Sequence, residues 1–592
     1  MTDVSEYGGS VAEQIDDPSG SGETSPDELN AVARENASRV ERNYRRADFA
    51  DAAAVSDDES LIEVPSRTSS PAPSPPRTPS YVDSSPSLAT HPALQNFDII
   101  CTICSYVHHG TLAPLASTCR IFERPALDVL WRNLHSVAPL VRCLPSDLFG
   151  IDQGHMALLN PLDAKMWDIL CKYTTRVYSI TQSGRSAVIE ALGSLMLSYP
   201  SASASLFPNL RKLTWHADGT HCAAEFLRMA FVPTHLFLDM RISSASPIFL
   251  SVLSSLGTLS PHLRIMTMKY PSATNDSLRK ASPFIAQSIS QLHHLRKLSI
   301  WDLGNQGMER LMQLRALQTL WLDLKGDRRS HLRVPGFHDL HSLTLCIDNL
   351  NHASDFLSSL QVIRSKGMTL RFTAAHPSAS ASTTLSQFFA VLQETCDHDN
   401  LESFALVGYW GQVHTKPGDF TPLHACRNLT RLLVENGCNI SMADEELCTL
   451  VGAWPKLEVL AISRFVAIND TTMPTFRGLI SLLRLCPALT SLTLVIDATN
   501  LQGIDFHTPG GGICNNHLES LILSNSPISS PLDVALFLSG LFPYLECVEL
   551  DCWDSAPKNL LHQKQSAIKQ WEAVNLFLCS FTIVRERWME AL

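Results

Sequence analysis

The sequence predicts an α/β protein in which a short module of three helices is followed by an irregular repeat solenoid, with parallel strands inside and helices outside. Two observations support this fold class. Apolar residues between His91 and Leu134 recur at helical spacing in three short runs. From about residue 205, a leucine pattern, L-x-x-L-x-L, recurs roughly every 30 residues and alternates with longer apolar segments.

The charge is unevenly distributed along the 592 residues. The formal net charge is −12, and residues 1–90 hold 17 acidic residues and 7 arginines but no lysine, so this segment alone carries −10. The rest of the chain is nearly neutral, whereas nucleic-acid binding needs clustered positive charge, so we expect no nucleic-acid partner. Residues 1–90 are also rich in Ser and Pro and poor in aliphatic runs, which predicts a disordered acidic tail.

A pair of cysteines lies at the start of the helical region, in the stretch CTICSYVHH from Cys101 to His109. A structural zinc site needs four ligands, and no second C-x-x-C and no H-x-x-x-H lies nearby in the sequence. On a helix these cysteines fall among apolar positions, so we interpret Cys104 as a buried core residue. The following HHG ends this helix, and Thr111 is the predicted cap of the next one.

Residues 91–135 resemble an F-box of the form common in fungal proteins. The family pattern begins near Leu-Pro-x-Glu-Ile, continues with helical Ile and Leu, and ends near Leu-Trp. The matching residues here are Phe97-Asp98-Ile99-Ile100, Leu112, Leu115, Cys119-Arg120, Phe122 and Leu130-Trp131. The start departs from the family pattern, because Asn96-Phe97 stands in place of Leu-Pro and Asp98 in place of Glu.

The resemblance implies docking rather than catalysis, because in the family this module packs against the Skp adaptor of a cullin–RING ubiquitin ligase. The implied partners are therefore a Skp adaptor and, through it, a cullin scaffold. The residues implied for adaptor binding are Phe97, Ile99, Ile100, Ile103, Leu112, Leu115, Cys119, Phe122, Leu130 and Trp131. The alternative is that four of the larger side chains pack only inside this chain, namely Leu112, Leu115, Phe122 and Trp131.

The L-x-x-L-x-L pattern resembles leucine-rich repeats, with copies such as LRKLTW from Leu210, LRKLSI from Leu295 and LECVEL from Leu545. Positions 1, 4 and 6 of each copy point inward from a short strand, and one strand–helix unit cannot bury its own face, so the units stack. The predicted parts are a helical linker and N-terminal cap over residues 136–204, repeats over residues 205–555 and a C-terminal helical cap over residues 556–592. Four residues of that cap are expected over the last repeat: Trp571, Leu576, Phe577 and Phe581.

The outward strand positions predict a concave binding face. Early repeats place Arg296 and Lys297 on this face and late repeats place glutamates such as Glu519, so it runs from basic to acidic. Trp301 follows LRKLSI and Trp321 occupies position 5 of LQTLWL, in adjacent repeats. Because exposed tryptophans are effective interface anchors, the predicted substrate-binding residues are Trp301, Trp321, Arg296 and Lys297. The alternative is that both tryptophans fold against their own sheet.

The sequence contains no phosphate loop and no G-x-S-x-G or H-E-x-x-H motif, so we expect neither an enzyme nor a cofactor or metal site. The chain start has no signal-peptide pattern, and the apolar run from Val574 to Val584 is far short of the ~20 residues of a membrane span. We therefore expect a soluble cytoplasmic or nuclear protein without a membrane partner. The resemblance implies the substrate-recognition subunit of an SCF-type ubiquitin ligase whose solenoid binds a target protein. The alternative is a leucine-rich-repeat scaffold with a degraded F-box and no ligase role.

Overall fold

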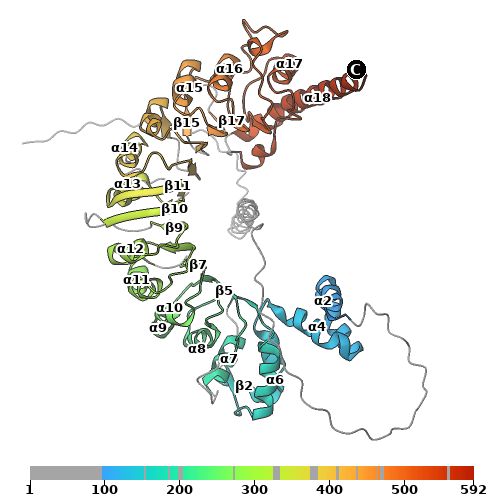
Figure 1. Ribbon diagram of the computed structural model, residues 1–592, viewed down its shortest axis with the longest axis vertical. Coiled ribbons are helices and arrows are strands. Elements are labelled where there is room, and N and C mark those ends of the chain that lie inside the picture. The colour runs from blue at the N-terminus through green and yellow to red at the C-terminus, as the bar shows by residue number, and fades with distance from the viewer. Residues whose placement is uncertain are drawn as a thin grey trace, which may run out of the picture. The chain divides into compact units, whose positions relative to one another are not determined.

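The computed structural model describes residues 96–152, 155–184, 187–197, 205–270, 274–324, 334–373, 385–408, 413–434, 438–462, 465–466, 472–556 and 560–591 (Figure 1). All of these residues belong to one compact unit, Ala89–Leu592. The tail predicted over residues 1–90 lies outside the described residues.

Three short helices open the described chain, as predicted: α2 (Phe97–Tyr106), α3 (His109–Thr118) and α4 (Arg120–Arg132). The first begins where it does because Asn96 Oδ1 accepts hydrogen bonds from the backbone N–H groups of Asp98 and Ile99, at 2.9 and 3.4 Å. An asparagine at this position stabilises a helix by about 1 kcal/mol relative to alanine. The residue that departs from the family pattern therefore supports the helix start.

The second helix begins three residues earlier than its predicted start. His108 Nδ1 accepts a hydrogen bond from the backbone N–H of Gly110 at 3.2 Å, so His108 is the cap and α3 starts at His109. The prediction that Thr111 caps this helix is wrong, and its hydroxyl instead donates to the backbone oxygen of His108 at 2.7 Å. His108 can cap this helix because its imidazole lies next to the first backbone N–H groups of the helix, which have no partner within the helix itself.

The three helices share a small core of their own. Its fully buried members are Ile100, Cys104, Leu112 and Ala126, each at most 1 % exposed. Cys104 is thus the core residue that the sequence predicted. Four side chains form little core for a module of this size, so its stability depends on further contacts.

One large parallel sheet follows, and its strand order is β1-β4-β5-β6-β7-β8-β9-β10-β11-β12-β14-β16-β17-β18. The strands are β1 (Asn133–Leu134), β4 (Ser179–Ser183), β5 (Lys212–His216), β6 (Phe237–Arg241), β7 (Ile265–Lys269), β8 (Lys297–Trp301), β9 (Thr319–Asp323), β10 (Val334–Ile347), β11 (Leu360–Phe372), β12 (Ser403–Val407), β14 (Arg431–Val434), β16 (Val459–Ile462), β17 (Ser491–Leu494) and β18 (Ser520–Ile522). Two small pairs lie outside it, β2 (Phe149–Asp152) with β3 (His155–Leu158) and β13 (Val413–Thr415) with β15 (Cys438–Ile440). Parallel neighbours in chain order are what stacked strand–helix repeats produce.

The helices described after α4 lie mostly between strands and on the outer side of the sheet, whereas the last one follows the final strand (Figure 1). They are α5 (Ala138–Arg142), α6 (Ala164–Thr174), α7 (Ala187–Leu197), α8 (His221–Ala230), α9 (Pro247–Ser254), α10 (Leu256–Leu259), α11 (Asn275–Ile289), α12 (Gly304–Met312), α13 (Leu350–Ser358), α14 (Leu385–Thr395), α15 (Asp444–Val451), α16 (Phe476–Leu485), α17 (Pro531–Leu541) and α18 (Leu561–Ala591). Short 3-10 turns fill the remaining connections: η2 (Ser146–Leu148), η3 (Pro417–Ala425), η5 (Pro509–Gly511) and η6 (Asp551–Ser555). Several helices start at a hydroxyl that accepts a hydrogen bond from a first-turn N–H, such as Thr220, Ser246 and Ser530.

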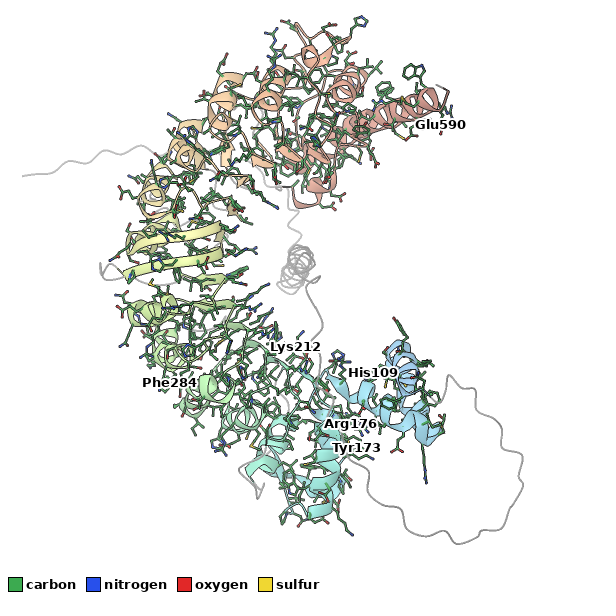
Figure 2. The ribbon with its side chains drawn as sticks, in the orientation of Figure 1. His109, Tyr173, Arg176, Lys212, Phe284 and Glu590 are labelled. Atoms are coloured by element: carbon green, nitrogen blue, oxygen red, sulfur yellow. The ribbon has the colours of Figure 1, made fainter. Side chains whose placement is uncertain are left out.

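The leucine pattern has the predicted orientation. In the copy at β8, Leu295, Leu298 and Ile300 are at most 2 % exposed, while Arg296 and Lys297 are not buried. Figure 2 shows the same alternation, with Lys212 on the strand side of the repeats and Phe284 on the helix side. The chain is therefore an α/β leucine-rich-repeat solenoid behind a three-helix module, as the sequence predicted.

The solenoid begins earlier than predicted. β1 follows α4 without a linker, and Asn133 pairs with Ser179 of β4 in parallel register. β4 in turn pairs with β5, where Ile180 aligns with Leu213. The region 136–204 therefore contributes a strand to the sheet as well as helices. The leucine pattern did not predict this strand, because its sequence, SITQS, alternates in burial but lacks the leucines of the later copies.

The last leucine copy, LECVEL from Leu545, does not form a strand. The side-chain amide of Asn575 on α18 instead pairs with Val548, since Oδ1 accepts from the Val548 N–H at 2.8 Å and Nδ2 donates to the Val548 oxygen at 2.9 Å. Only Glu549 N–H reaches the preceding strand, donating to the Leu521 oxygen at 2.8 Å. One asparagine thus takes the place of a neighbouring strand at the end of the solenoid.

The C-terminal helix covers the last repeat with three of the four predicted side chains. Trp571 is fully buried, and Phe577 and Phe581 are half-buried against the main core. Leu576 is 68 % exposed, so its predicted packing is wrong. It lies on the opposite side of the helix from the buried Val574 and Leu578, two residues away on either side.

Candidate functional site

The first candidate surface is a row of exposed apolar side chains on α2. Ile99, Ile103 and Tyr106 are 40, 39 and 88 % exposed, and their spacing of four and then three residues puts them on one face of the helix. We call these three residues the α2 stripe. None of the three belongs to the module core that Ile100 and Cys104 help to form, so they remain exposed on α2.

The other residues implied for adaptor binding fall into three groups. Phe97 and Cys119 are exposed, and Leu115, Phe122 and Leu130 are half-buried around the module core. Ile100, Leu112 and Trp131 are at most 8 % exposed, so a docking role for these three side chains is wrong. They lie inside the chain because three short helices must first bury a core of their own before a partner can be docked on them. For Leu112 and Trp131 the internal alternative is correct.

Trp131 marks the junction between the module and the solenoid. Its ring stacks on Tyr173 of α6 with the centroids 4.6 Å apart, and it belongs to the large core rather than to the module core. Stacked aromatic pairs contribute about 0.5–1.5 kcal/mol beyond the burial of their area. The module is thus attached to the solenoid through a stacked aromatic pair, in which Trp131 is buried and Tyr173 half-buried.

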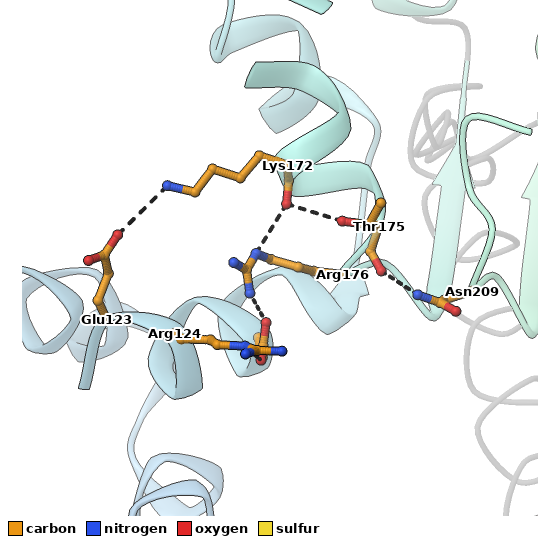
Figure 3. A network of polar contacts seen from close by, with 7 residues as sticks. Glu123, Arg124, Lys172, Thr175, Arg176 and Asn209 are labelled. Carbon is orange, nitrogen blue, oxygen red and sulfur yellow. Dashed lines mark hydrogen bonds and ion pairs between the residues drawn. The ribbon is translucent and has the colours of Figure 1, made fainter. Parts of the chain in front are cut away.

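A polar network reinforces this junction (Figure 3). Arg176 forms an ion pair with Asp128 of α4, and its Nε–H donates to the backbone oxygen of Lys172 at 3.1 Å. The Arg176 side chain is only 16 % exposed, and burial lowers its pKa, an effect to which the neighbouring Arg124 adds. Lys172 Nζ lies 3.7 Å from a carboxylate oxygen of Glu123, but that pair is half-exposed and contributes little.

The second candidate surface is the concave face of the sheet. From β5 to β11 the outward positions, read from the strand register, are Lys212, Thr214, His216, Phe237, Asp239, Arg241, Ile265, Thr267, Lys269, Lys297, Ser299, Trp301, Thr319, Trp321, Asp323, Ser342, Thr344, Cys346, Gly367, Thr369 and Arg371. Five of these side chains are cationic and two are carboxylates. We call this part of the sheet the basic half. The described outward positions of β12 to β18 hold one charged side chain, Arg431.

Trp321 lies in the middle of the basic half. Arg371 Cζ is 4.8 Å and Lys269 Nζ is 5.9 Å from the centroid of its ring. The indole N–H donates to Cys346 Sγ at 2.6 Å, which fixes the ring orientation. Burial, with Asp323 nearby, raises the pKa of the Cys346 thiol to about 11, so this cysteine stays protonated and unreactive at neutral pH.

Trp301 does not share this position, so the prediction that both tryptophans project together onto the concave face is wrong. Register aligns Trp321 with Ser299, whereas Trp301 aligns with Asp323, two residues further along. Trp301 is 5 % exposed, and its indole N–H donates to Ser282 Oγ on α11 at 3.1 Å. At the strand end the ring can turn over the edge of the sheet, where it buries its area and satisfies its N–H.

The predicted change from basic to acidic side chains occurs in the row of residues that immediately precede the strands. Residues in this row are joined by backbone hydrogen bonds from one repeat to the next, from Arg264 and Arg296 to Glu402 and Glu519. Arg296 is exposed and Lys297 is half-buried. The two parts meet at Lys366, whose Nζ lies 3.1 Å from Glu402 Oε1. The acidic end continues into an open hollow of about 450 Å³ lined by Glu519, Tyr544, Glu546 and Glu549, which the sequence patterns did not reveal.

Burial keeps several titratable side chains of the solenoid in their neutral forms. Burial raises the pKa of the Cys396 and Cys486 thiols to about 12, and it lowers the pKa of His235 to about 4. Within the described residues, no group of three or more His, Cys, Asp or Glu side chains could hold a metal ion. No described helix is long and apolar enough to cross a membrane.

No family model matches the chain, and no curated protein matches it. Among solved structures, the chain is similar to an internalin, inlF, from Listeria monocytogenes, with 15% sequence identity, a TM-score of 0.31, and coverage of 63% of this chain and 87% of that chain. It is also similar to a chain of the Rad7 and Elc1 complex in yeast, with 13% identity, a TM-score of 0.27, and coverage of 54% and 77%. Because these TM-scores are low, the fold assignment rests on the strand ladder and the leucine pattern of this chain alone.

Proposed function

We propose that this chain is the substrate-recognition subunit of an SCF-type ubiquitin ligase, acting in the cytoplasm, the nucleus or both. The α2 stripe docks the Skp adaptor, the adaptor connects the chain to a cullin, and the concave face binds the target protein. The chain itself has no catalytic role in this scheme. It raises the effective concentration of target lysines near the activated ubiquitin that its partners carry.

The observation that supports this proposal is the α2 stripe. The module has a core of only four fully buried side chains, yet three large apolar side chains of α2 face outward at helical spacing. Exposed apolar side chains grouped on one helix face are typical of a protein–protein contact. The junction through Trp131 and Arg176 orients that face relative to the repeats, which a bridging subunit requires.

Co-purification of the full chain with a Skp adaptor tests the proposal. The variant Ile99→Asp/Ile103→Asp places two carboxylates in the stripe and is expected to lose capture, because each buried interface anchor is worth on the order of 2 kcal/mol. Ser105→Asp is the matched control, since Ser105 is exposed on α2 but lies away from the stripe. Its capture is expected to equal that of the unmodified chain.

Two results would contradict the proposal. In the first, the folded unmodified chain captures no adaptor, which leaves a leucine-rich-repeat scaffold without a ligase role. In the second, the stripe variant and the Ser105→Asp control capture the adaptor equally, which removes the α2 stripe from the contact. Circular dichroism and thermal unfolding of all three proteins confirm that the comparison is between folded chains.

A further inference from the structure

We propose that the basic half of the concave face binds an extended acidic peptide segment of the target protein, with Trp321, Lys269 and Arg371 as its central contacts. This inference deepens the proposed function, because it gives the class of target that the solenoid recognises. It stands on the strand register, the charge of the outward positions and the geometry around one tryptophan.

The charge balance is the first step of the argument. Over the seven strands from β5 to β11, the outward side chains hold five cations against two carboxylates, whereas residues 91–592 as a whole carry a net charge of only −2. One carboxylate, Asp239, lies beside a histidine of the neighbouring strand, with a carboxylate oxygen 3.5 Å from His216 Nε2. The basic half is therefore a local positive surface on a nearly neutral part of the chain, and it attracts oxyanions rather than cations.

The arrangement around Trp321 is the second step. Lys269 comes from β7 and Arg371 from β11, so the two cations approach the ring from opposite sides of β9. The positions beside Trp321 in register are Ser299 and Thr344, whose short side chains leave room for these long ones. The electron-rich face of the indole attracts both cations and so orients them. Two cations held near one ring present a pre-organised pair of donors to a ligand.

The spacing of the cations defines the peptide. Because both distances are measured from the same ring centroid, Lys269 Nζ and Arg371 Cζ are at most about 11 Å apart. In an extended peptide, side chains two residues apart lie on the same side about 7 Å from each other. Oxyanions at positions i and i+2 can therefore contact both cations while the peptide backbone crosses the Trp321 ring. Carboxylates and phosphoryl groups share this chemistry, because both accept charge-assisted hydrogen bonds from cationic side chains.

Beyond β11 the chemistry of the face changes. The outward positions of β12 to β16 include Ala405, Val407, Leu433 and Val459, and they hold a single cation, Arg431. An acidic segment therefore fits over β7 to β11 and no further along the solenoid. The face therefore suits one stretch of acidic peptide better than a uniformly charged polymer that follows the whole solenoid.

Fluorescence anisotropy of the full chain with a labelled peptide tests the inference. The probe is an extended peptide containing Glu-Ser-Glu, and its matched forms carry Gln-Ser-Gln or phosphoserine in place of the two glutamates. The acidic peptides are expected to bind and the glutamine peptide to bind at least about tenfold more weakly, since a charge-assisted hydrogen bond is worth about that factor. Binding is expected to weaken as the ionic strength rises from about 0.05 M to about 0.3 M, because salt screens exposed charges.

Variants of the chain separate this site from general charge effects. Lys269→Gln/Arg371→Gln is expected to weaken binding of the acidic peptides about tenfold or more. Arg315→Gln removes one positive charge from the repeat that holds Trp321, at an exposed turn between α12 and β9, and is expected to change binding less than about twofold. Preference for phosphoserine or glutamate identifies the natural oxyanion, and either preference supports the site.

The inference is overturned if the double variant and Arg315→Gln bind the acidic peptide equally, or if the glutamine peptide binds as tightly. It is also overturned if a single-stranded oligonucleotide of equal charge binds more tightly and displaces the peptide, because the occupant is then a nucleic acid. The Ile99→Asp/Ile103→Asp variant distinguishes the two proposals. It is expected to lose the adaptor and keep the peptide, so a chain that captures no adaptor but binds the peptide contradicts only the ligase role.

Discussion

The side chain of Asn575 makes a strong prediction about the C-terminal end of the solenoid. Its amide forms two hydrogen bonds with the backbone of Val548, at 2.8 and 2.9 Å, where a strand pair would otherwise form. Val548 is 1 % exposed, so replacing Asn575 by alanine leaves a buried N–H and a buried carbonyl without these partners. Each unsatisfied buried backbone group costs about 1–3 kcal/mol, and the half-buried setting of Asn575 favours the lower part of that range.

We therefore expect Asn575→Ala to lower the free energy of unfolding by about 2–3 kcal/mol in total. Ser580→Ala is the matched control, because Ser580 lies on the same helix and its hydroxyl donates only to the exposed backbone oxygen of Leu576. Urea unfolding followed by circular dichroism measures the difference. Hydrogen exchange of residues 545–550 locates it, since a repeat protein opens from the repeat whose neighbour contact is weakened.

The reasoning is refuted if Asn575→Ala and Ser580→Ala unfold at the same urea concentration and residues 545–550 keep the same protection. That result would mean that packing of Trp571 and Val574 alone closes the solenoid. A loss of stability spread evenly over all repeats would also contradict it, because the two lost hydrogen bonds are local.

Two further predictions concern single titratable side chains, His235 and Arg176, that lie inside the chain. Burial lowers the pKa of His235 from 6.5 to about 4, so the unfolded chain binds a proton that the folded chain does not, and stability is expected to fall as the pH drops below about 6.5. Between about pH 7 and about pH 5 the loss amounts to about 2 kcal/mol, and urea unfolding at both values should show it in the unmodified chain but not in His235→Gln. Replacing Arg176 by methionine removes the ion pair with Asp128 and is expected to increase hydrogen exchange in α4, whereas Arg124→Met, at a 77 % exposed side chain, should not. Equal exchange in the two arginine variants would show that Trp131 alone holds the junction.

The leucine pattern predicted most of the fold because its period carries direct information about burial. Each L-x-x-L-x-L copy fixes which side chains face the helices, and the buried Leu298 and Ile300 follow from that alternation alone. The pattern failed at LECVEL, where Val548 pairs with the side chain of Asn575 on α18, 27 residues later in the chain, and no strand forms. Local periodicity contains no information about a side chain that replaces a strand. The opposite failure occurs at SITQS, which lacks the leucine pattern but forms a strand that pairs with β5.

The candidate sites were predicted less completely, because a strand position does not determine the direction of a side chain at the strand end. Trp321, inside its strand, lies on the concave face as predicted, whereas Trp301, the last residue of its strand, turns toward Ser282. Arg371 went unnoticed because its strand, GMTLRF, is a degenerate copy of the pattern. The register of β9, β10 and β11 aligns Arg371 with Asp323, two residues beyond Trp321, and from there its Cζ lies 4.8 Å from the indole centroid.

The junction between module and solenoid determines how the two proposed contacts can work together. α4 ends at Arg132 and β1 begins at the next residue, so the module enters the sheet directly through the pairing of Asn133 with Ser179. A flexible linker would let the target sample many positions and would dilute its effective concentration near the ligase partners. A short connection reinforced by Trp131 and Arg176 instead fixes one relation between the α2 stripe and the basic half. The adaptor that binds the stripe therefore also sets where a bound peptide is presented, and loosening the junction is expected to slow ubiquitin transfer while leaving both binding steps intact.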